Sequence, residues 1–349
     1  MTGPTEAAGN PILVEVTRGP LVESRHAGAL AVVDEAGSTV FALGDVARLV
    51  FPRSAVKPIQ ALPLVETGAA DACGFGPEHL ALAQASHSGS EAHTAVVRDM
   101  LARAGASPAD LECGAHPPFD EAARAALARS GEEPGPLHNN CSGKHAGFIA
   151  VARHLGVPVA GYVAPGHPVQ QRVTAALAAL TGSSLGEDVR GTDGCSIPAY
   201  AVPLDRLAFG FARLASGKGM EAARAAAARR LLTAATAHPH LVAGEGRFDT
   251  AAMRALGGRA LVKSGAEGVL CAAVPERRLG LAVKADDGAG RAAEAIMAAT
   301  LAALLALGDT EREALGRLVV APVRSRRRDV VGEVRPSEVL RGALPAVRS

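Results

Sequence analysis

Several residue types are scarce in this sequence, and each scarcity argues against a class of protein. The 349-residue chain has no Trp, two Tyr and five Cys. Five irregularly spaced Cys in a chain this long do not form a disulfide framework, and they fit a reducing compartment. The formal net charge is +1, far from the strongly basic balance typical of nucleic-acid binders. We therefore expect no nucleic-acid partner.

Long hydrophobic runs are also missing. The longest, around residues 296–307, is shorter than the roughly 20 apolar residues that a bilayer-spanning helix needs. The first ten residues are polar and do not resemble a secretory signal. Hydrophobic residues nevertheless make up 48% of the chain, which is ample for a folded core. We expect a soluble, cytoplasmic, globular protein with no membrane partner, and its size favours an enzyme.

Lysine is rare beside arginine. Of the 36 basic residues, five are lysines: Lys57, Lys144, Lys218, Lys263 and Lys284. The simplest interpretation is a compositional bias that turned every replaceable Lys into Arg. A retained Lys is then a candidate for a task that needs a neutral amine, because a guanidinium stays protonated. Four of the five lie in polar motifs, whereas Lys218 lies in a Ser-Gly-Lys-Gly stretch typical of a solvated loop.

Hydropathy patterns predict strands near both ends of the chain and helices between them. Strands are expected at 29–33, 39–43, 260–263, 268–274, 279–284 and 330–334. Helices are expected at 54–66, 77–83, 91–104, 121–130, 144–155, 168–180, 204–215, 220–237 and 289–307. We expect an α+β protein with one catalytic domain of two lobes: a sheet lobe (about 12–50 and 258–336) and a mainly helical lobe (about 51–257). A cleft between lobes is a usual place for a site.

A Ser-x-x-Lys motif lies where the first central helix begins. Pro58 must occupy the first helical turn, so Ser54 lies close to the N-cap and Lys57 about one turn further on. A neutral Lys57 is suited to take the proton of Ser54. The alternative is an ordinary Ser cap beside a surface Lys, and for this motif alone that alternative is the commoner one.

Two further segments come from breaks between predicted helices. Ser86 and His87 follow an apolar helix end, where a buried hydroxyl needs a partner, and Ser90 is well placed to cap the next helix. A lone His is more often structural than catalytic. Near the other end of the chain, Lys263 ends a strand beside a Gly-rich turn and is able to point across a cleft. The segment at Lys284 is interpreted as structural, with Asp287 able to cap the final long helix.

The densest polar cluster is His-Asn-Asn-Cys-Ser-Gly-Lys-His, residues 138–145. Cys141 and Lys144 are three apart and face one way at a helix start, and Cys195 lies in a second polar segment, 192–198. From their spacing, the first interpretation of Cys141 and Cys195 is two inert thiols. Two metal ligands are the second interpretation, and a disulfide is the third. The paired spacing of a four-ligand structural zinc site is lacking, so a metal here suits an open, functional site.

Taken together and in order, these segments resemble the asparaginase II family, the rhizobial-type L-asparaginases. The residues that carry the resemblance lie in segments 14–19, 23–26, 53–58, 86–88, 138–147, 191–198 and 263–268. The similarity spans about residues 12–322. The basic run at 324–328 and the last dozen residues depart from it.

The resemblance implies a fold similar to serine β-lactamases and penicillin-binding proteins, and a homodimer that hydrolyses L-asparagine to L-aspartate and ammonia. It implies two Ser-Lys pairs in one cleft, Ser54 with Lys57 and Ser86 with Lys263. It implies a zinc ion held by Cys141, Lys144 and Cys195, with water completing the shell. Arg53, His145 and Asp193 would lie near the substrate, with Asp193 suited to its α-ammonium.

The expected chemistry is acyl transfer, in which Ser54 attacks the amide with Lys57 as base. Ser86 and Lys263 would tune Lys57, relay protons or supply the oxyanion site, and the choice of nucleophile stays open. One alternative is a Ser-x-x-Lys peptidase, esterase or β-lactam-processing enzyme, since Lys263-Ser264-Gly265 is close to a Lys-Thr-Gly triplet. Another is a non-catalytic protein that binds zinc or a ligand through its cysteines.

Overall fold

A central antiparallel sheet joins the two ends of the chain in the computed structural model, which describes residues 9–344. The strands lie in the order β11-β12-β1-β2-β10-β9-β8, and β3 pairs with β2. Their bounds are β1 (Ile12–Arg18), β2 (Leu21–Asp34), β3 (Thr39–Leu43), β8 (Leu261–Ser264), β9 (Val269–Val274), β10 (Leu279–Ala285), β11 (Ala321–Arg324) and β12 (Val330–Pro336). The predicted strands are therefore present, and β1 and β11 are additional. Most of the N-terminal stretch interpreted above, and the end of the tail, lie outside the described residues.

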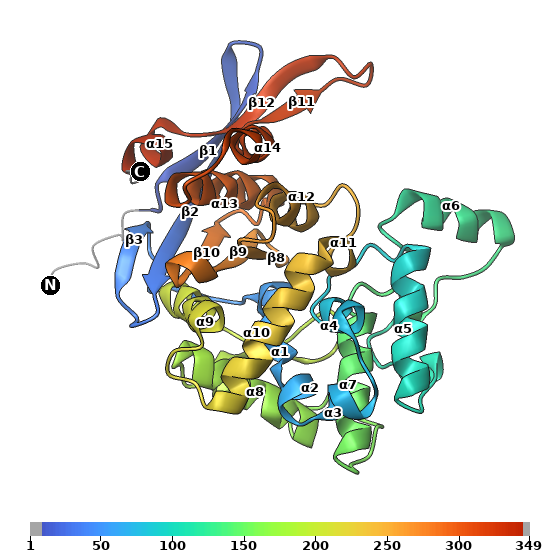
Figure 1. Cartoon of the computed structure of the whole chain (residues 1–349). Helices are drawn as coiled ribbons and strands as arrows, with labels where there is room; N and C mark the ends of the chain where they lie inside the picture. The colour runs from blue at the N-terminus through green and yellow to red at the C-terminus, as the bar shows by residue number, and fades with distance from the viewer. Residues whose placement is uncertain (1–8, 345–349) are drawn as a thin grey trace, which may run out of the picture.

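The centre of the sheet is covered on both faces. Helix α9 (Leu204–Ser216) packs on β10 and β2, and α13 (Gly290–Leu304) packs on β9 and β10 from the other side (Figure 1). All six residues of β9 are buried, which explains why this strand is a continuous apolar run rather than an alternating one. Gly280 in β10 allows α9 to approach closely, because a Cβ there would collide with the backbone of Ala208 and Ala212.

Helices fill the middle of the chain, as predicted. They are α4 (Pro77–Leu82), α5 (Glu91–Arg103), α6 (Glu121–Ser130), α7 (Ser142–His154), α8 (Pro168–Thr181), α9, α10 (Ala222–Ala237) and α13. Short helices not predicted individually are α3 (Ala69–Ala72), α11 (Pro239–Val242), α12 (Phe248–Ala255), α14 (Asp309–Val319) and α15 (Glu338–Ala343). With the antiparallel sheet, they make the architecture α+β, as expected.

The helix predicted over 54–66 is divided into three pieces. A 3₁₀ turn (Arg53–Val56) leads into α1 (Lys57–Gln60), and α2 (Leu62–Glu66) follows. Pro58 and Pro63 each lie in the first turn of their helix, where the missing N–H costs nothing. Each proline therefore starts a new helix, and the break places Lys57 at the first residue of α1.

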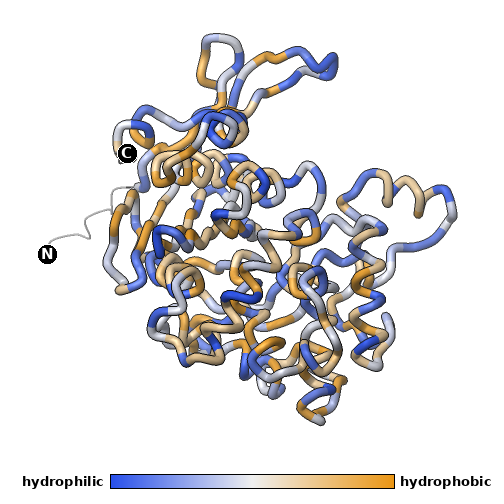
Figure 2. Tube along the Cα trace, in the orientation of Figure 1, coloured by the Kyte–Doolittle hydropathy of each residue, from blue (hydrophilic) through white to orange (hydrophobic). Residues whose placement is uncertain are grey.

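Helix α7 runs through the interior of the helical half. All of residues 142–152 are buried, and Gly143 lies against the backbone carbonyl of Leu82. By contrast, α6 has no buried residue and lies at the edge of the molecule (Figure 1), and hydrophobic stretches recur in the strands and in the helices (Figure 2). The polar residues at the start of α7 are thus held inside the protein rather than on its surface.

Two short two-stranded sheets lie apart from the central one. Strand β4 (Leu49–Val50) pairs with β7 (Val202–Pro203), and β5 (Arg190–Thr192) pairs with β6 (Pro198–Tyr200). The tight loop between β5 and β6 carries Asp193 and Cys195, and it is closed by a bond from Asp193 N–H to Ile197 O of 2.9 Å. This loop therefore presents both residues from one rigid turn.

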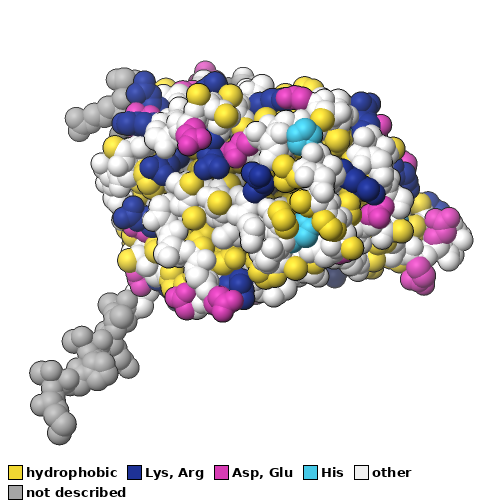
Figure 3. All heavy atoms as spheres, turned by 90° about the horizontal axis from the view of Figure 1, so that it is seen from below, with side chains coloured by type: hydrophobic (Ala, Val, Ile, Leu, Met, Phe, Trp, Pro, Cys, Tyr) yellow, Lys and Arg dark blue, Asp and Glu magenta, His cyan; other side chains and the backbone are white. Residues whose placement is uncertain are grey.

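The surface mixes charges of both signs. Seen from below Figure 1, acidic and basic side chains lie interspersed among small hydrophobic patches (Figure 3). Several arginines pair with carboxylates, such as Arg224 with Glu66 at 2.6 Å. Among the helices in the described part of the chain, none combines the length and the apolar character that crossing a membrane requires.

Candidate active site

Lys57 lies in the interior, so the interpretation of this motif as a Ser cap with a surface Lys is wrong. Its side chain is 1% exposed. Nζ donates to the carbonyl of Ala85 at 2.5 Å and to Oγ of Ser86 at 2.9 Å. The buried hydroxyl of Ser86 thus has the partner that its position after an apolar helix end requires. A Ser-Lys contact is formed between two segments that are 29 residues apart.

Ser54 and Arg53 lie in the 3₁₀ turn that precedes Lys57, and both are partly exposed. Arg53 has a φ of +50°, a conformation that non-glycine residues rarely adopt and that clusters at functional sites. Its guanidinium donates to the carboxylate of Asp193 at 3.3 Å. Burial raises the pKa of Asp193, but Lys144 and Arg53 lower it more, so this carboxylate is held ionised. Two of the three residues expected near the substrate therefore meet across the site.

Lys263 has a different partner from the one expected. Its Nζ donates to Oδ2 of Asp249 at 3.1 Å and to the carbonyl of Ser264 at 2.8 Å, whereas Ser86 bonds to Lys57. Lys263 and Asp249 are both fully buried. Burial lowers the pKa of Lys263 to about 8, against the opposing effect of Asp249. The expected Ser86–Lys263 pair is thus replaced by a Lys263–Asp249 ion pair.

Sequence analysis missed Asp249. Its Oδ2 also accepts from the backbone N–H and the hydroxyl of Ser264, while Oδ1 is buried without a partner among the described residues. Asp249 lies in α12, a short helix for which no periodicity was recognised. The sequence signal for Asp249 was an acidic residue between Phe248 and Thr250. In the structure both of these neighbours are buried.

Cys141, Lys144 and Cys195 form one buried cluster. Cys141 and Cys195 are free thiols rather than a disulfide, and Lys144 Nζ lies 3.1 Å from Cys195 Sγ. Cys141 Sγ lies 3.2 Å from Oδ1 of Asn140. The neighbouring Cys195, Lys57 and Lys144 lower the pKa of Cys141, whereas Cys141 and burial raise the pKa of Cys195. Cys141 is therefore the thiol that more readily becomes a thiolate.

Two of the three donors of this cluster, the cysteine thiols, are of a type that zinc prefers. No set of three His, Cys, Asp or Glu residues suited to a metal occurs within residues 9–344, so a metal site here would have to draw on Lys144. A neutral lysine amine would be the third donor, and three protein ligands would leave a position open. Burial lowers the pKa of Lys144, but the charges of the two cysteines and Asp193 outweigh it and raise the pKa. Metal binding must therefore displace a proton from this lysine.

Two buried histidines flank the cluster and differ in their hydrogen bonds. His87 uses both ring nitrogens: Nδ1 accepts from the N–H of Gly89, and Nε2 lies 2.8 Å from Oγ of Ser142. This agrees with a structural role. His145 in α7 uses Nδ1, 2.7 Å from the hydroxyl of Tyr162, while Nε2 is buried without a partner among the described residues. Burial, with Lys144 and Lys57 nearby, lowers the pKa of His145 well below its usual range, so the ring is neutral.

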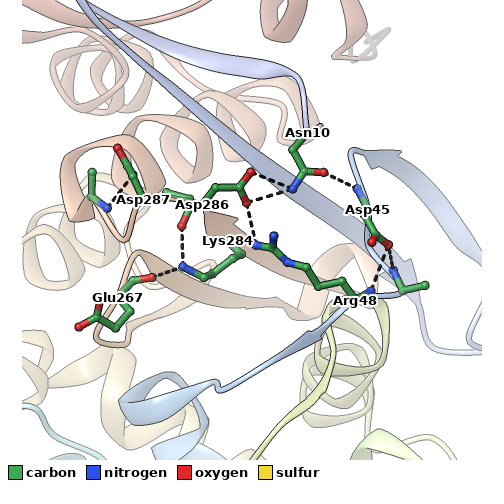
Figure 4. A network of polar contacts seen from close by, with 10 residues as sticks. Asn10, Asp45, Arg48, Glu267, Lys284, Asp286 and Asp287 are labelled. Atoms are coloured by element: carbon green, nitrogen blue, oxygen red, sulfur yellow. Dashed lines mark hydrogen bonds and ion pairs between the residues drawn. The ribbon is translucent and has the colours of Figure 1, made fainter. Parts of the chain in front are cut away.

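A cavity of about 640 Å³ opens beside Arg53, and its lining includes Arg48, Phe51, Thr192, Glu267 and Lys284. Figure 4 shows the polar network at its wall, in which Lys284 Nζ donates to the carbonyls of Glu267 and Ala285, both at 2.6 Å. Arg48 pairs with Asp286 at 2.7 Å. The structural interpretation of Lys284 agrees with these contacts.

The capping role expected of Asp287 is not observed. The N-cap of α13 is Ala289, and Asp287 instead accepts the N–H of Ala289 at 3.0 Å within the preceding turn. Its other oxygen lies 2.5 Å from Nδ1 of His26. Lys218 is exposed and pairs with Glu35 at 3.4 Å, as expected of a solvated loop residue.

The chain matches the family model L-asparaginase II over residues 14–336. Similar solved structures include a β-lactamase from Mycobacterium bovis (15% identity, TM-score 0.40, covering 76% of this chain and 89% of that chain). A class C β-lactamase from Rhodobacter sphaeroides is 15% identical, with a TM-score of 0.37 and coverage of 84% of this chain and 93% of that chain. Mglu in its native form is 17% identical with a TM-score of 0.39, and the match covers 74% of this chain and 56% of that chain.

Such low TM-scores carry no argument about this chain. The search of curated proteins found no match to this chain. The family model, by contrast, covers nearly all of the chain and includes every motif described above. The chain therefore belongs to the L-asparaginase II family.

Proposed function

We propose that this protein is an L-asparagine amidohydrolase that releases L-aspartate and ammonia. The observation that carries the proposal is the buried hydrogen bond of 2.9 Å between Lys57 and Ser86, in a chain of the L-asparaginase II family. A hydroxyl held by a buried lysine is an arrangement suited to acyl transfer. Linear amides are the substrate class that the family match favours over β-lactams.

The proposed reaction passes through an acyl-enzyme. The hydroxyl oxygen of Ser54 bonds to the side-chain amide carbon of asparagine, and its proton passes to Lys57. The C–N bond then breaks, and the leaving nitrogen takes a proton to depart as ammonia. Water attacks the resulting ester, which gives aspartate and restores Ser54. Ser54 lies three residues before Lys57, whose Nζ donates to Ser86 in the structure, so the transfer from Ser54 is the part of the proposal that the variants below test.

Ser86 and Lys263 have supporting roles in this proposal. Ser86 accepts from Lys57 and is therefore placed to relay a proton, or to act as the nucleophile in place of Ser54. Lys263, whose pKa is lowered to about 8, is readily neutralised near physiological pH. Lys57 is one of the groups that lower the pKa of Lys263.

Substrate recognition falls to three residues in this proposal. The ionised carboxylate of Asp193 is suited to the α-ammonium of asparagine, and Arg53, its present partner at 3.3 Å, is suited to a carboxylate. The ammonium of an amino-acid substrate is thus matched by Asp193, and its carboxylate is matched by Arg53. His145 adds a buried ring nitrogen that has no partner within the described protein.

We also propose that Cys141, Lys144 and Cys195 hold a zinc ion. Bound zinc would supply a fixed positive charge that orients the substrate and neighbouring side chains. The chain's own contribution is to bury both thiols and to hold Lys144 Nζ 3.1 Å from Cys195 Sγ. A homodimer in the cytoplasm completes the proposal, and sedimentation of the purified protein tests the dimer.

Ammonia release from L-asparagine tests the function. The purified protein is assayed as isolated, after chelation and with zinc restored. Release in any condition supports an amidohydrolase, and the difference between conditions measures the contribution of zinc. No release from folded protein in all three conditions would contradict the proposal and favour another Ser-Lys substrate.

Single variants separate the two serines. Added hydroxylamine captures an acyl-enzyme as the aspartyl hydroxamate, so hydroxamate formation reports the acylation step. We expect Ser54→Ala to abolish hydroxamate formation and Ser86→Ala to slow it. The reverse result would assign the nucleophile to Ser86. A non-catalytic binding protein would show neither ammonia nor hydroxamate, and Ser54→Ala would change nothing.

A further inference from the structure

Tyr162 is the hydrogen-bond partner of His145 Nδ1. The tyrosine lies in the turn between α7 and α8, is fully buried, and places its hydroxyl 2.7 Å from Nδ1 of His145. The same hydroxyl oxygen lies 2.8 Å from the backbone nitrogen of Glu112. Because a backbone N–H only donates, the phenol oxygen is the acceptor in that bond.

This arrangement determines the tautomer of the histidine. The phenol has one proton of its own, and His145 Nδ1 is the neighbour able to accept it. An accepting Nδ1 carries no proton, so the single ring proton of the neutral imidazole lies on Nε2. Nε2 is on the side of the ring away from Tyr162, where it is a buried donor without a partner in the described protein. A buried unpaired donor is costly, which points to a missing acceptor.

We propose that Tyr162 is a positioning residue that fixes this tautomer, so that Nε2–H of His145 donates to an oxygen atom of the bound amino-acid substrate. The proposal deepens the proposed function and depends on it for the identity of the substrate. An oxygen is the chemically matched partner because a ring N–H donates and Nε2 has no acceptor within the described protein. Asp193, across the site, is the group suited to the ammonium.

His87 provides an internal reference. Its Nδ1 accepts from the N–H of Gly89, so its proton also lies on Nε2, where Ser142 is the partner. Ser142 in turn donates to the carbonyl of Leu137, so each donor in this chain of bonds has an acceptor. The two histidines thus have the same tautomer, but only that of His145 depends on Tyr162.

Nitrogen NMR of the substrate-free protein tests the tautomer directly. In uniformly ¹⁵N-labelled protein, we expect His145 and His87 both to show a protonated Nε2 and an unprotonated Nδ1, with His145→Gln identifying the His145 signals. In Tyr162→Phe, which keeps the ring and removes the hydroxyl, the proton of His145 should redistribute to Nδ1 while His87 stays unchanged. A protonated Nδ1 in the wild type, or an unchanged His145 pattern in Tyr162→Phe, would overturn the proposal.

Kinetics then test whether the tautomer serves the substrate. Tyr162→Phe should raise KM for L-asparagine by about fivefold, the worth of one hydrogen bond, with little change in kcat. In a His145→Gln background, the amide NH₂ offers a donor whether or not Tyr162 is present. Tyr162→Phe should therefore add no further rise in KM there. If the two changes are additive, Tyr162 has a purely structural role and the proposal fails.

Failure of the proposed amidohydrolase function and failure of the positioning role of Tyr162 would give different experimental results. The NMR measurement needs no substrate and no turnover. If the wild type releases no ammonia but shows the expected tautomer, the proposed function fails and the positioning role of Tyr162 stands. If Tyr162→Phe does not fold, the wild-type spectrum alone still decides which nitrogen of His145 is protonated.

Discussion

The two sides of the site handle buried positive charge in opposite ways. On the sheet side, Lys263 of β8 is matched by Asp249 at 3.1 Å, and both are fully buried. On the helical side, Lys57 donates to neutral oxygens at Ala85 and Ser86, and Lys144 lies against Cys195. The sheet side thus pairs its buried lysine with a carboxylate, whereas the two lysines of the helical side lie against neutral oxygens and a cysteine sulfur.

This difference indicates that the two sides of the site have different roles. The ion pair with Asp249 holds Lys263 in one position. On the helical side, Lys57 and Lys144 favour a thiolate at Cys141. The lysines that escape replacement by arginine therefore do so for different reasons on the two sides.

The largest expected effect comes from removing Lys57 on the helical side. Lys57→Met keeps the apolar stem and deletes the amine, so it should lower kcat for L-asparagine by roughly 10²–10⁴-fold, the usual contribution of a catalytic base. The pKa of Lys263 should rise at the same time, because Lys57 is one of the groups that lower it. Ammonia release measures the first effect. Lys218→Met, at an exposed lysine, is the matched control and should retain full activity.

A smaller fall than tenfold in Lys57→Met would show that the base lies on the other side of the site. Lys263→Met should then produce the large fall instead. Assaying both variants in parallel therefore assigns the base to one side.

Breaking the ion pair on the sheet side should act on stability. Asp249→Asn removes the countercharge of a fully buried ammonium, which typically costs about 3–5 kcal/mol in the free energy of unfolding. Urea denaturation measures this. The matched control is Asp249→Asn with Lys263→Met, in which neither charge remains and much of the loss should be recovered. If the double variant is as unstable as the single one, the cost comes from packing around Asp249 and not from the unpaired charge.

The dependence of stability on pH sharpens the same comparison. The pKa of Lys263 is lowered by burial from 10.5 to about 8, so between these values the unfolded chain binds more protons than the folded one. The free energy of unfolding should therefore rise with pH across this window, by about 1.4 kcal/mol for each unit between the two pKa values. Below pH 8, where both states are protonated, the contribution should be constant.

The variant with Asp249→Asn and Lys263→Met serves as the reference in this experiment, because other groups also titrate above pH 8. Its stability curve is subtracted from that of the wild type. A difference that falls with rising pH would mean that the ion pair outweighs burial and raises the pKa of Lys263.

Much of the fold followed from the sequence because its patterns are local. The continuous apolar run of β9 and the hairpin of β2 and β3 need no distant information to be recognised. The polar segments of the site were also recognised, since clustered polar residues beside an apolar helix seldom serve packing. What the sequence did not contain was the partner of each side chain. Lys263 was expected beside Ser86 from the family resemblance, and a strand end does not itself specify that its side chain bonds to Asp249 instead.

Asp249 and Tyr162 were missed for related reasons. Asp249 lies in an eight-residue helix with too few turns to show a period, and its carboxylate meets Lys263 only after α12 packs on β8. Tyr162 is a single aromatic residue in a turn, which alone indicates nothing about hydrogen bonding. Both residues act on a neighbour that the sequence did identify, so contacts were needed to find them.

The smallest expected effect tests why lysine is retained at all. Lys218→Arg changes an exposed residue whose ion pair with Glu35 spans 3.4 Å, so the free energy of unfolding should move by less than about 0.5 kcal/mol. Lys263→Arg forces a larger, permanently charged group into a fully buried position and should be clearly destabilising. Urea denaturation of the two variants under identical conditions makes the comparison. Equal effects at the two positions would show that burial and chemistry did not select these lysines, and that their survival among so many arginines is compositional chance.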